Sequence, residues 1–455
     1  MGSLWFETAL LPEGWRRSVR LHHVGGKITA VEIGVARDAG EDGGAIGLPG
    51  LGNVHSHAFQ RGMAGLAETH SPGGDDFWSW RETMYRFVDR MTPEDVQAVA
   101  AMAYAEMLES GFTRVGEFHY LHHDLVGAAY GDVGEMAGRV AAATQETGIG
   151  LTLLPVFYAQ GGFDRAPPSP AQRRFVNTID GYARLMEASR RAVAGLPDAV
   201  VGVAPHSLRA VTPEQLALVT PMARGGPIHI HIAETTREVD DCLAWSGARP
   251  VSWLLDHAAV DEDWCLVHAT HVSETELARL AEIFSGVVGL CPITEANLGD
   301  GVFPAAEFVD EAGYFAIGSD SNVLIDAAEE LRTLEYGQRL TRRRRNVMFE
   351  FEWASVGRAL FVGALGGGAQ ALGAWTDAGI RIGASADLIG LDETHPSLLG
   401  RREDALLDSW IFAARGGAVR TVWRRGEKVV SGGRHVRRDA IVAAYGRSLA
   451  HLLEG

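Results

Sequence analysis

The sequence is short of lysine, and it has no apolar run long enough to cross a membrane. The only lysines among its 455 residues are Lys27 and Lys428, which lie near the two ends of the chain. Any catalytic chemistry in the middle of the chain must therefore proceed without lysine. The N-terminus has no basic region followed by an apolar core, so we expect no signal peptide.

Basic residues are outnumbered by acidic ones, and the formal net charge at pH 7 is −17. Binding to a nucleic-acid backbone depends on basic surface, so a nucleic-acid partner is not expected. One basic run, Arg342 to Arg345, departs from the trend, and a solvated helix end or linker explains it best. We therefore expect no nucleic-acid partner and, without an apolar run of spanning length, no membrane partner.

Cysteine is also scarce, because only Cys242, Cys265 and Cys291 occur, with no short spacing between them. Cys265 and Cys291 lie in apolar runs typical of strands. They are interpreted as buried free thiols of a protein in a reducing compartment, and the cytoplasm is the expected location.

The two ends of the chain share one pattern. Residues 1–48 alternate short apolar runs with turns rich in glycine and aspartate, which is typical of small antiparallel strands. Similar runs return near residues 380–391 and 419–430. We predict that residues 1–48 and 372–455 form one small β-sandwich domain, with residues 49–371 inserted between them.

The middle of the chain alternates helical patterns with short, nearly all-apolar runs. Such runs indicate strands of a parallel sheet that is covered on both faces. Eight β/α units close into a TIM-type (β/α)8 barrel, which is the fold predicted for residues 49–371. The eight runs are residues 49–57, 113–119, 149–157, 199–205, 227–233, 264–269, 286–292 and 314–320.

His55 and His57 end the first of these strands. Side chains alternate along a strand, so the two imidazoles point the same way. At the mouth of a barrel they would form half of a tetrahedral metal site. The alternative is that two of the seventeen histidines fell close together by chance.

Further ligand candidates follow strands five and eight. His231 lies nearer the end of its strand than His229, which we interpret as a deeper, hydrogen-bonded core residue. With His55, His57 and Asp320, it completes an N/O ligand set suited to zinc or ferrous iron. Each histidine taken singly could instead be a core or loop residue, and Asp320 could be a helix N-cap.

Five stretches, residues 53–57, 231–234, 266–268, 318–320 and 385–392, resemble the amidohydrolase superfamily, whose members combine a metal-bearing (β/α)8 barrel with a small β domain from both chain ends. A second set, residues 55–61, 205–209, 231–234, 238–242 and 267–271, is similar more narrowly to the formiminoglutamate deiminases. These enzymes hydrolyse N-formimino-L-glutamate to N-formyl-L-glutamate and ammonia in histidine degradation.

The scarcity of lysine narrows the branch of this superfamily. Binuclear relatives bridge two metal ions with a carboxylated lysine from the fourth strand. No lysine lies between residues 28 and 427, so one divalent ion is expected, most simply Zn²⁺ with Fe²⁺ as the alternative.

The resemblance implies a role for three side chains beside the metal-activated water. Glu234 would protonate the imine nitrogen and then the leaving amine as a general acid. His268 would orient the attacking hydroxide, and Asp320 would accept a proton from the water while it contacts the metal. The alternative for Glu234 is an ordinary surface carboxylate.

The resemblance implies a small-molecule substrate with two carboxylates, so the pocket should hold arginines that receive them. Arg209, after strand four, and Arg81, in the loop that starts at Trp78, are the candidates. Gln60, Tyr120 and His206 would add hydrogen bonds. Arg81, like Arg61, could equally be a solvated or helix-bridging residue.

Three other functions are compatible with this fold. They are a deaminase of nucleobases or other amidine or guanidine compounds, a metal-free scaffold protein, and a mononuclear hydrolase of cyclic amides. A homodimer is the expected assembly, because twofold dimers are the commonest oligomers.

Overall fold

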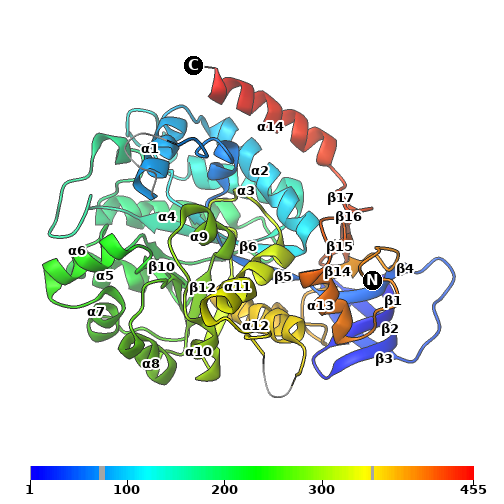
Figure 1. Cartoon of the computed structure of the whole chain (residues 1–455). Helices are drawn as coiled ribbons and strands as arrows, with labels where there is room; N and C mark the ends of the chain where they lie inside the picture. Colours follow the sequence, from blue (N-terminus) through cyan, green and yellow to red (C-terminus); the bar gives the residue numbers. More distant parts are fainter. Residues whose placement is uncertain (1, 71–76, 350–352, 455) are drawn as a thin grey trace.

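The computed structural model describes residues 2–70, 77–349 and 353–454. It shows a large barrel surrounded by helices and a smaller sheet at one side (Figure 1). The chain is a TIM-type (β/α)8 barrel with a separate β domain that both chain ends build. Both parts agree with the predicted fold class.

The barrel strands are short and almost fully buried. Strands three and four pair through β8 and β9, two short pieces of the fourth strand. In chain order the barrel strands are β5 (Leu51–Ser56), β6 (Phe112–His119), β7 (Gly150–Phe157), β8 (Val200–Val201), β9 (Ala204–Pro205), β10 (Ile228–Ile232), β11 (Trp264–His268), β12 (Val287–Leu290) and β13 (Tyr314–Ile317).

Backbone hydrogen bonds join the two halves of the barrel at both seams. At one seam, His57 N donates to Asp320 O and Asp320 N donates to His55 O, both at 2.9 Å. At the other, His231 N donates to His206 O at 3.0 Å. The metal-ligand candidates therefore lie on the residues that close the barrel.

Helices cover the outside of the barrel between consecutive strands, as Figure 1 shows. The helices of the barrel are α1 (Phe77–Val88), α2 (Pro93–Ser110), α3 (Glu135–Thr147), α4 (Ile179–Val193), α5 (Pro213–Val219), α6 (Thr236–Ser246), α7 (Pro250–His257), α8 (Glu274–Ile283), α9 (Pro292–Leu298), α10 (Ala305–Asp310), α11 (Ala327–Arg342) and α12 (Val356–Ala371).

Local sequence explains where these helices begin and end. Helix α2 starts after Thr92, whose hydroxyl accepts from Asp95 N while the Asp95 carboxylate accepts from Thr92 N. This capping box satisfies backbone donors that the first turn leaves open. The helix stops at Gly111, whose φ of 109° a residue with a Cβ rarely adopts.

The strands from the two ends form one eight-stranded sheet in the order β17-β16-β15-β14-β4-β1-β2-β3. Most neighbours are antiparallel, as expected, but β1 and β4 pair in parallel. The strands are β1 (Gly2–Leu11), β2 (Gly14–Val24), β3 (Lys27–Ile33), β4 (Asp42–Pro49), β14 (Leu388–Leu391), β15 (Val419–Arg424), β16 (Glu427–Ser431) and β17 (Arg434–His435), with α13 (Asp404–Phe412) between β14 and β15.

This sheet folds over a core of its own. Ile28 N donates to Ala384 O and Ala386 N to Gly26 O, both at 2.9 Å, so the segment before β14 returns to the β3 end of the sheet. Phe6 and Trp423, which are fully buried, contact edge to face inside the fold. The run at residues 380–383 was expected to be a strand, but it forms bends and turns.

A buried ion network joins the sheet to the base of the barrel. Arg424 of β15 contacts Asp387 and lies 2.6 Å from Asp198, which also accepts from Arg114 of β6 at 3.0 Å. The last helix, α14 (Arg438–Leu453), lies along α2 of the barrel in Figure 1. The Tyr445 hydroxyl of α14 donates to Arg61 O at 3.2 Å.

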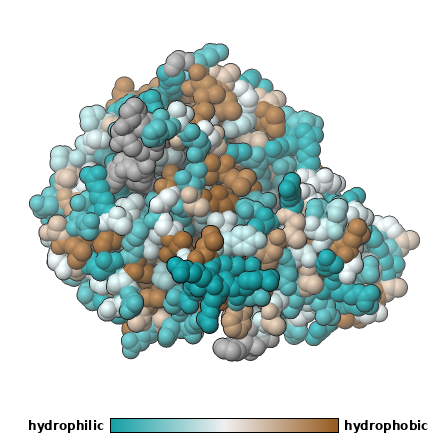
Figure 2. Space-filling view, viewed as in Figure 1, coloured by the Kyte–Doolittle hydropathy of each residue, from teal (hydrophilic) through white to brown (hydrophobic). Residues whose placement is uncertain are grey.

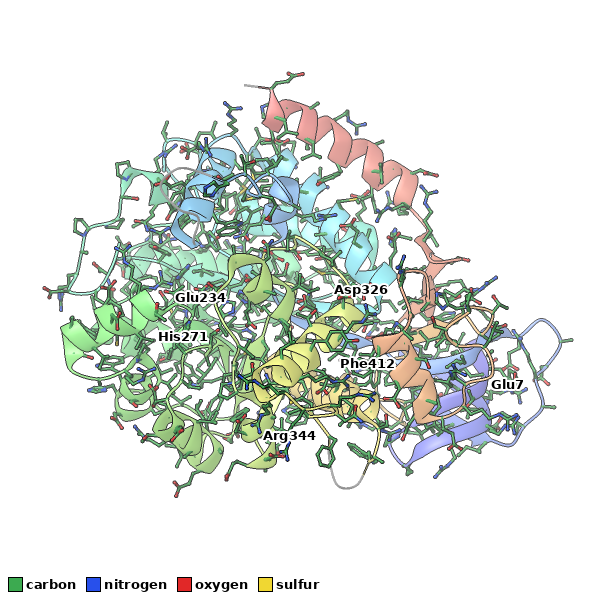
Figure 3. The ribbon with its side chains drawn as sticks, in the orientation of Figure 1. Glu7, Glu234, His271, Asp326, Arg344 and Phe412 are labelled. Carbon is green, nitrogen blue, oxygen red and sulfur yellow. The ribbon has the colours of Figure 1, made fainter. Side chains whose placement is uncertain are left out.

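The basic run and the cysteines lie where the sequence predicted them. The basic run starts at the end of α11, and Arg343 to Arg345 are exposed. It gives the strongly hydrophilic patch at the lower centre of Figure 2, where Figure 3 labels Arg344. All three cysteines are buried and free. Among the described residues, no helix is long and apolar enough to span a membrane.

Candidate metal centre

Three histidines and one aspartate meet at the mouth of the barrel. Nε2 of His55 lies 3.2 Å from Nε2 of His57 and 2.9 Å from Nε2 of His231. Asp320 Oδ1 lies 3.4 Å from His55 Nε2 and 3.2 Å from His57 Nε2. One ligand atom from each residue falls within 4.8 Å of all the others, so the four can hold one ion.

Backbone carbonyls fix how two of these imidazoles are protonated. Nδ1 of His57 donates to Phe118 O at 3.0 Å, and Nδ1 of His231 donates to His206 O at 3.1 Å. A carbonyl can only accept, so the neutral rings carry their lone pairs on Nε2. Nε2 of His55 lies about 3 Å from both of these lone pairs, and a neutral ring can donate one proton there at most. At least one lone pair is therefore left for a cation, so the donor set fits a metal ion.

Burial keeps the imidazoles in the form that binds metal. Burial lowers the pKa of His55 to about 3 and that of His231 well below its ordinary value. A metal ligand must be deprotonated at the donor nitrogen. These two histidines are therefore neutral at physiological pH before any ion binds.

Glu234, from the loop after β10, lies beside the four ligands. Its Oε1 is 3.8 Å from His268 Nε2, and its Oε2 is 3.6 Å from Arg209 Nη2. Glu238, at the start of α6, is fully buried and lies 3.5 Å from Arg209 Nε. The Arg209 guanidinium thus lies within 3.6 Å of both buried carboxylates and offsets their negative charge.

His268, at the end of β11, is held from behind by Glu295 of α9. Its Nδ1 donates to Glu295 Oε1 at 3.2 Å, and that oxygen also accepts from Cys291 N at 2.9 Å. Burial disfavours the charged ring, but the charge of Glu234 and the bond to Glu295 outweigh it and raise the pKa of His268 to about 10. Glu295 is a residue that the sequence analysis missed.

The backbone is strained where the strands enter the site. Ala233, His268, Ala269 and Asp320 have φ of 50°, 70°, 50° and 44°, in the left-handed region that residues with a Cβ rarely adopt. Such strain persists only where the surroundings enforce it, and it concentrates at functional sites. Here it turns the side chains after β10, β11 and β13 towards one point.

A small cavity of about 50 Å³ opens above these residues. All five predicted substrate contacts line it, which are Gln60, Arg81, Tyr120, His206 and Arg209. Gln60 Nε2 donates to the Tyr120 hydroxyl at 2.9 Å, and His206 Nδ1 lies 3.1 Å from Ser207 Oγ. The stretch with Arg81 was expected to be a loop, but Arg81 lies on helix α1, over the ring of Tyr85.

The cavity has further lining residues that the sequence analysis did not single out. They are mostly aromatic, and the hydroxyl of Tyr158 accepts from Gln172 Nε2 at 2.6 Å. Tyr158 directly follows strand three, as Tyr120 follows strand two, so its position could have indicated it. The missed residues are Trp80, Met84, Tyr85, Tyr158, Phe175 and Leu298.

Other polar residues near the strand ends lie outside this cavity. His229 is fully buried and its Nε2 donates to Ala371 O at 2.7 Å, which confirms the interpretation of a hydrogen-bonded core residue. Arg61 pairs with Glu106 at 2.6 Å. His271 lines a separate surface groove, and Figure 3 labels it together with Glu234 on the barrel. Asp320 is not a helix N-cap, because Asp326 caps α11.

A buried three-histidine and one-aspartate set at the mouth of a (β/α)8 barrel defines the class of metal-dependent barrel hydrolases. Residues 46–429 match the profile of the amidohydrolase family, and residues 2–45 match that of the N-terminal domain of formimidoylglutamate deiminase HutF. The chain belongs to the amidohydrolase family.

Individual relatives agree with this assignment. The chain is 47% identical to formimidoylglutamate deiminase of Pseudomonas aeruginosa over the full length of both proteins. It is 32% identical to a 5-methylthioadenosine/S-adenosylhomocysteine deaminase of Natronomonas pharaonis, covering 89% of this chain and 86% of that one. A crystal structure of an amidohydrolase from Brucella melitensis superposes over the whole of both chains, with a TM-score of 0.96 and 52% identity.

Proposed function

We propose that the protein hydrolyses N-formimino-L-glutamate to N-formyl-L-glutamate and ammonia, a step of histidine degradation. Two findings support the substrate, namely the full-length similarity to formimidoylglutamate deiminase and the matching N-terminal domain. The observation that carries the chemistry is the set of imidazole nitrogens whose lone pairs converge beside Asp320 and Glu234.

We propose that His55, His57, His231 and Asp320 hold a single divalent ion. Zn²⁺ suits three imidazoles and one carboxylate in tetrahedral geometry, although Fe²⁺ binds the same donors. When bound, the ion supplies a water that is acidic enough to act as a nucleophile at neutral pH.

Three side chains transfer protons or orient the attacking water, namely Asp320, Glu234 and His268. Asp320 accepts the proton of the attacking water, and His268 donates a hydrogen bond that orients that water. Glu234 protonates the imine nitrogen, takes up the proton that the hydroxyl of the tetrahedral intermediate gives up, and passes it to the departing amine. The proton that Asp320 took from the water then restores the acid form of Glu234, so that one water is consumed and one ammonia leaves. The contact of 3.8 Å between Glu234 Oε1 and His268 Nε2 supports this arrangement, because the nitrogen that Glu234 protonates and the water that His268 orients are bonded to one carbon in the tetrahedral intermediate.

The two carboxylates of the substrate need cationic and hydrogen-bonding partners. Arg209 contacts Glu234 and Glu238 only at 3.5–3.6 Å, which leaves its N–H groups able to bind a substrate carboxylate more closely. Arg81 reaches the cavity from α1. Gln60, Tyr120 and His206 would fix the orientation of the bound diacid.

Release of ammonia from a substrate panel tests the proposal directly. The panel contains N-formimino-L-glutamate, N-guanidino-L-glutamate, guanine, cytosine, adenosine and a cyclic amide. Formiminoglutamate should have the highest kcat/KM, and metal analysis should give about one ion per chain. A nucleobase or nucleoside turned over faster would reassign the substrate, and hydrolysis of the amide without ammonia would reassign the reaction.

We also propose a cytoplasmic location and a homodimer. Three buried free thiols support a reducing compartment, and twofold symmetry is the commonest way for an enzyme of this kind to assemble. Light scattering of the purified protein would test the dimer by its mass. Fractionation of the source cells would test the location.

A further inference from the structure

A second group of metal-ligating atoms lies against the first and includes a cysteine that the proposed reaction does not use. One ligand atom each of His268, Cys291 and Asp320 lies within 4.8 Å of the other two, and all three residues are buried. Cys291 follows β12 and belongs to the apolar cluster that contains Val54 and Cys265. The Cys291 thiol therefore lies at the end of a barrel strand, close to His268 and Asp320.

The nitrogen of His268 that faces this group is available for a ligand. Glu295 accepts the hydrogen bond of Nδ1, so Nε2 is the ring nitrogen that can bind an ion, once it has given up its proton. That Nε2 has no hydrogen-bond partner among the described residues, although only 1% of His268 is exposed. A buried polar atom without a partner is uncommon and indicates a missing ligand or water.

The carboxylate of Asp320 presents a different oxygen to each group. Oδ1 lies 3.2–3.4 Å from His55 and His57, whereas Oδ2 lies 3.9 Å from His268 Nε2. Two ions bridged by one carboxylate lie about 3.5–4 Å apart in two-metal sites. Asp320 can therefore serve both groups without giving up its contact with the first.

We propose that His268, Cys291 and Asp320 form a second, weaker site for a thiophilic divalent ion, such as cadmium or excess zinc, and that filling it inhibits the enzyme. Thiolate and imidazole together select soft or borderline ions over calcium and magnesium. Binding displaces the protons of the Cys291 thiol and of His268 Nε2 to solvent. The predicted inhibition rests on the proposed function, because it removes His268 from the attacking water.

Cadmium titration of the one-metal enzyme tests this site without reference to turnover. A second equivalent should bind and produce the ultraviolet absorption of a cadmium thiolate, while ammonia release falls in parallel. Cys291→Ala should lose that absorption and bind the second cadmium ion about 10- to 100-fold more weakly. It should also continue to release ammonia in the presence of cadmium. Cys265→Ala is the matched control, because it removes another buried thiol of the same cluster.

Other outcomes would overturn the assignment. One is that the second cadmium ion binds to Cys291→Ala as tightly as to the unmodified enzyme, and another is that Cys291→Ala and Cys265→Ala lose its binding equally. Cadmium that only replaces the first ion would also contradict the second site. Cys291→Ser provides the same test if the alanine variant does not fold. An enzyme that binds two cadmium ions but releases no ammonia from formiminoglutamate would refute the proposed function and leave the second site standing.

Discussion

At the residue scale, the site depends on a few buried carboxylates with separate tasks. Asp320 contacts the histidines of the metal centre, Glu234 lies between His268 and Arg209, and Glu295 supports His268 from behind. Their separation would allow the three acids to take the separate roles proposed for them, namely metal binding by Asp320, proton transfer by Glu234 and orientation of the His268 ring by Glu295.

Glu234→Gln should abolish most turnover without loss of metal. The amide keeps the shape of the side chain but cannot donate an acidic proton, so kcat should fall by about 10²- to 10⁴-fold. Steady-state kinetics and metal analysis check this, with Glu282→Gln, an exposed carboxylate on α8, as the control. Loss of the metal from Glu234→Gln would instead make Glu234 a ligand.

Arg209→Gln should mainly weaken substrate binding. Loss of a charged hydrogen bond costs about 1.5–3 kcal/mol, which corresponds to a rise in KM of roughly 10- to 100-fold. The rise should be smaller for a substrate analogue that lacks one carboxylate. An unchanged kcat/KM for formiminoglutamate would show that Arg209 does not bind a carboxylate.

At the element scale, the metal centre depends on close contact between the first and last barrel strands. A Cβ at Gly318 would lie 2.8–2.9 Å from the backbone and Cβ of His55, which is closer than real atoms approach. Glycine is therefore required where the end of β13 meets β5, and this requirement links the closure of the barrel to the position of a proposed ligand.

Gly318→Ala should move β5 away from β13. Overpacking of this kind costs about 1–3 kcal/mol, and displacement of His55 should weaken metal binding by about tenfold or more. Thermal unfolding and metal retention after dialysis measure both effects. Gly366→Ala on α12 is the control, because a Cβ there meets no atom within 4 Å and alanine favours helix. Equal behaviour of the two variants would contradict the packing argument.

At the scale of the whole molecule, two buried features connect stability to charge. One is the ion network of Arg114, Asp198, Asp387 and Arg424, which joins the small sheet to the barrel. The other is a set of buried neutral histidines outside the metal centre, of which His119 is 1% exposed.

Asp198→Ala should destabilise the whole protein, because it leaves Arg114 and Arg424 buried with one partner fewer. Breaking a buried ion pair by removing one member costs about 3–5 kcal/mol. Urea unfolding would measure this cost. Glu7→Ala is the control, since Glu7 is exposed on the small sheet (Figure 3), 3.8 Å from Arg17, and its loss should cost less than about 1 kcal/mol.

The stability of the protein should fall as the pH drops from about 6.5 to 4. Burial lowers the pKa of His119 from 6.5 to about 4, so in this window the unfolded chain binds a proton that the folded chain excludes. The stabilisation is complete above pH 6.5 and is lost towards pH 4, with a limit of about 3 kcal/mol for this residue. The free energy of unfolding, measured in urea, should therefore fall less for His119→Leu than for the unmodified protein when the pH is lowered from 7 to 4.5. An identical loss in both proteins would contradict the assignment to His119.

The sequence alone determined the alternation of eight apolar strands with helices. The spacing of apolar residues indicates strand or helix, and a continuous apolar run indicates burial. The sequence also placed polar side chains at the ends of those strands, since the direction of a parallel barrel puts those ends together. The sequence also shows that no lysine lies between residues 28 and 427, which excludes a carboxylated-lysine bridge in the barrel.

Only the tertiary structure decided which polar residues face the cavity and which support them. Glu295 lies in a helix that follows a different strand from His268, and no local spacing connects the two. The position of Arg81 on a helix, the parallel pairing of β1 with β4 and the aromatic lining around Tyr158 likewise result from packing between distant segments. Local patterns record what each segment prefers, whereas contacts between segments depend on the closed barrel as a whole.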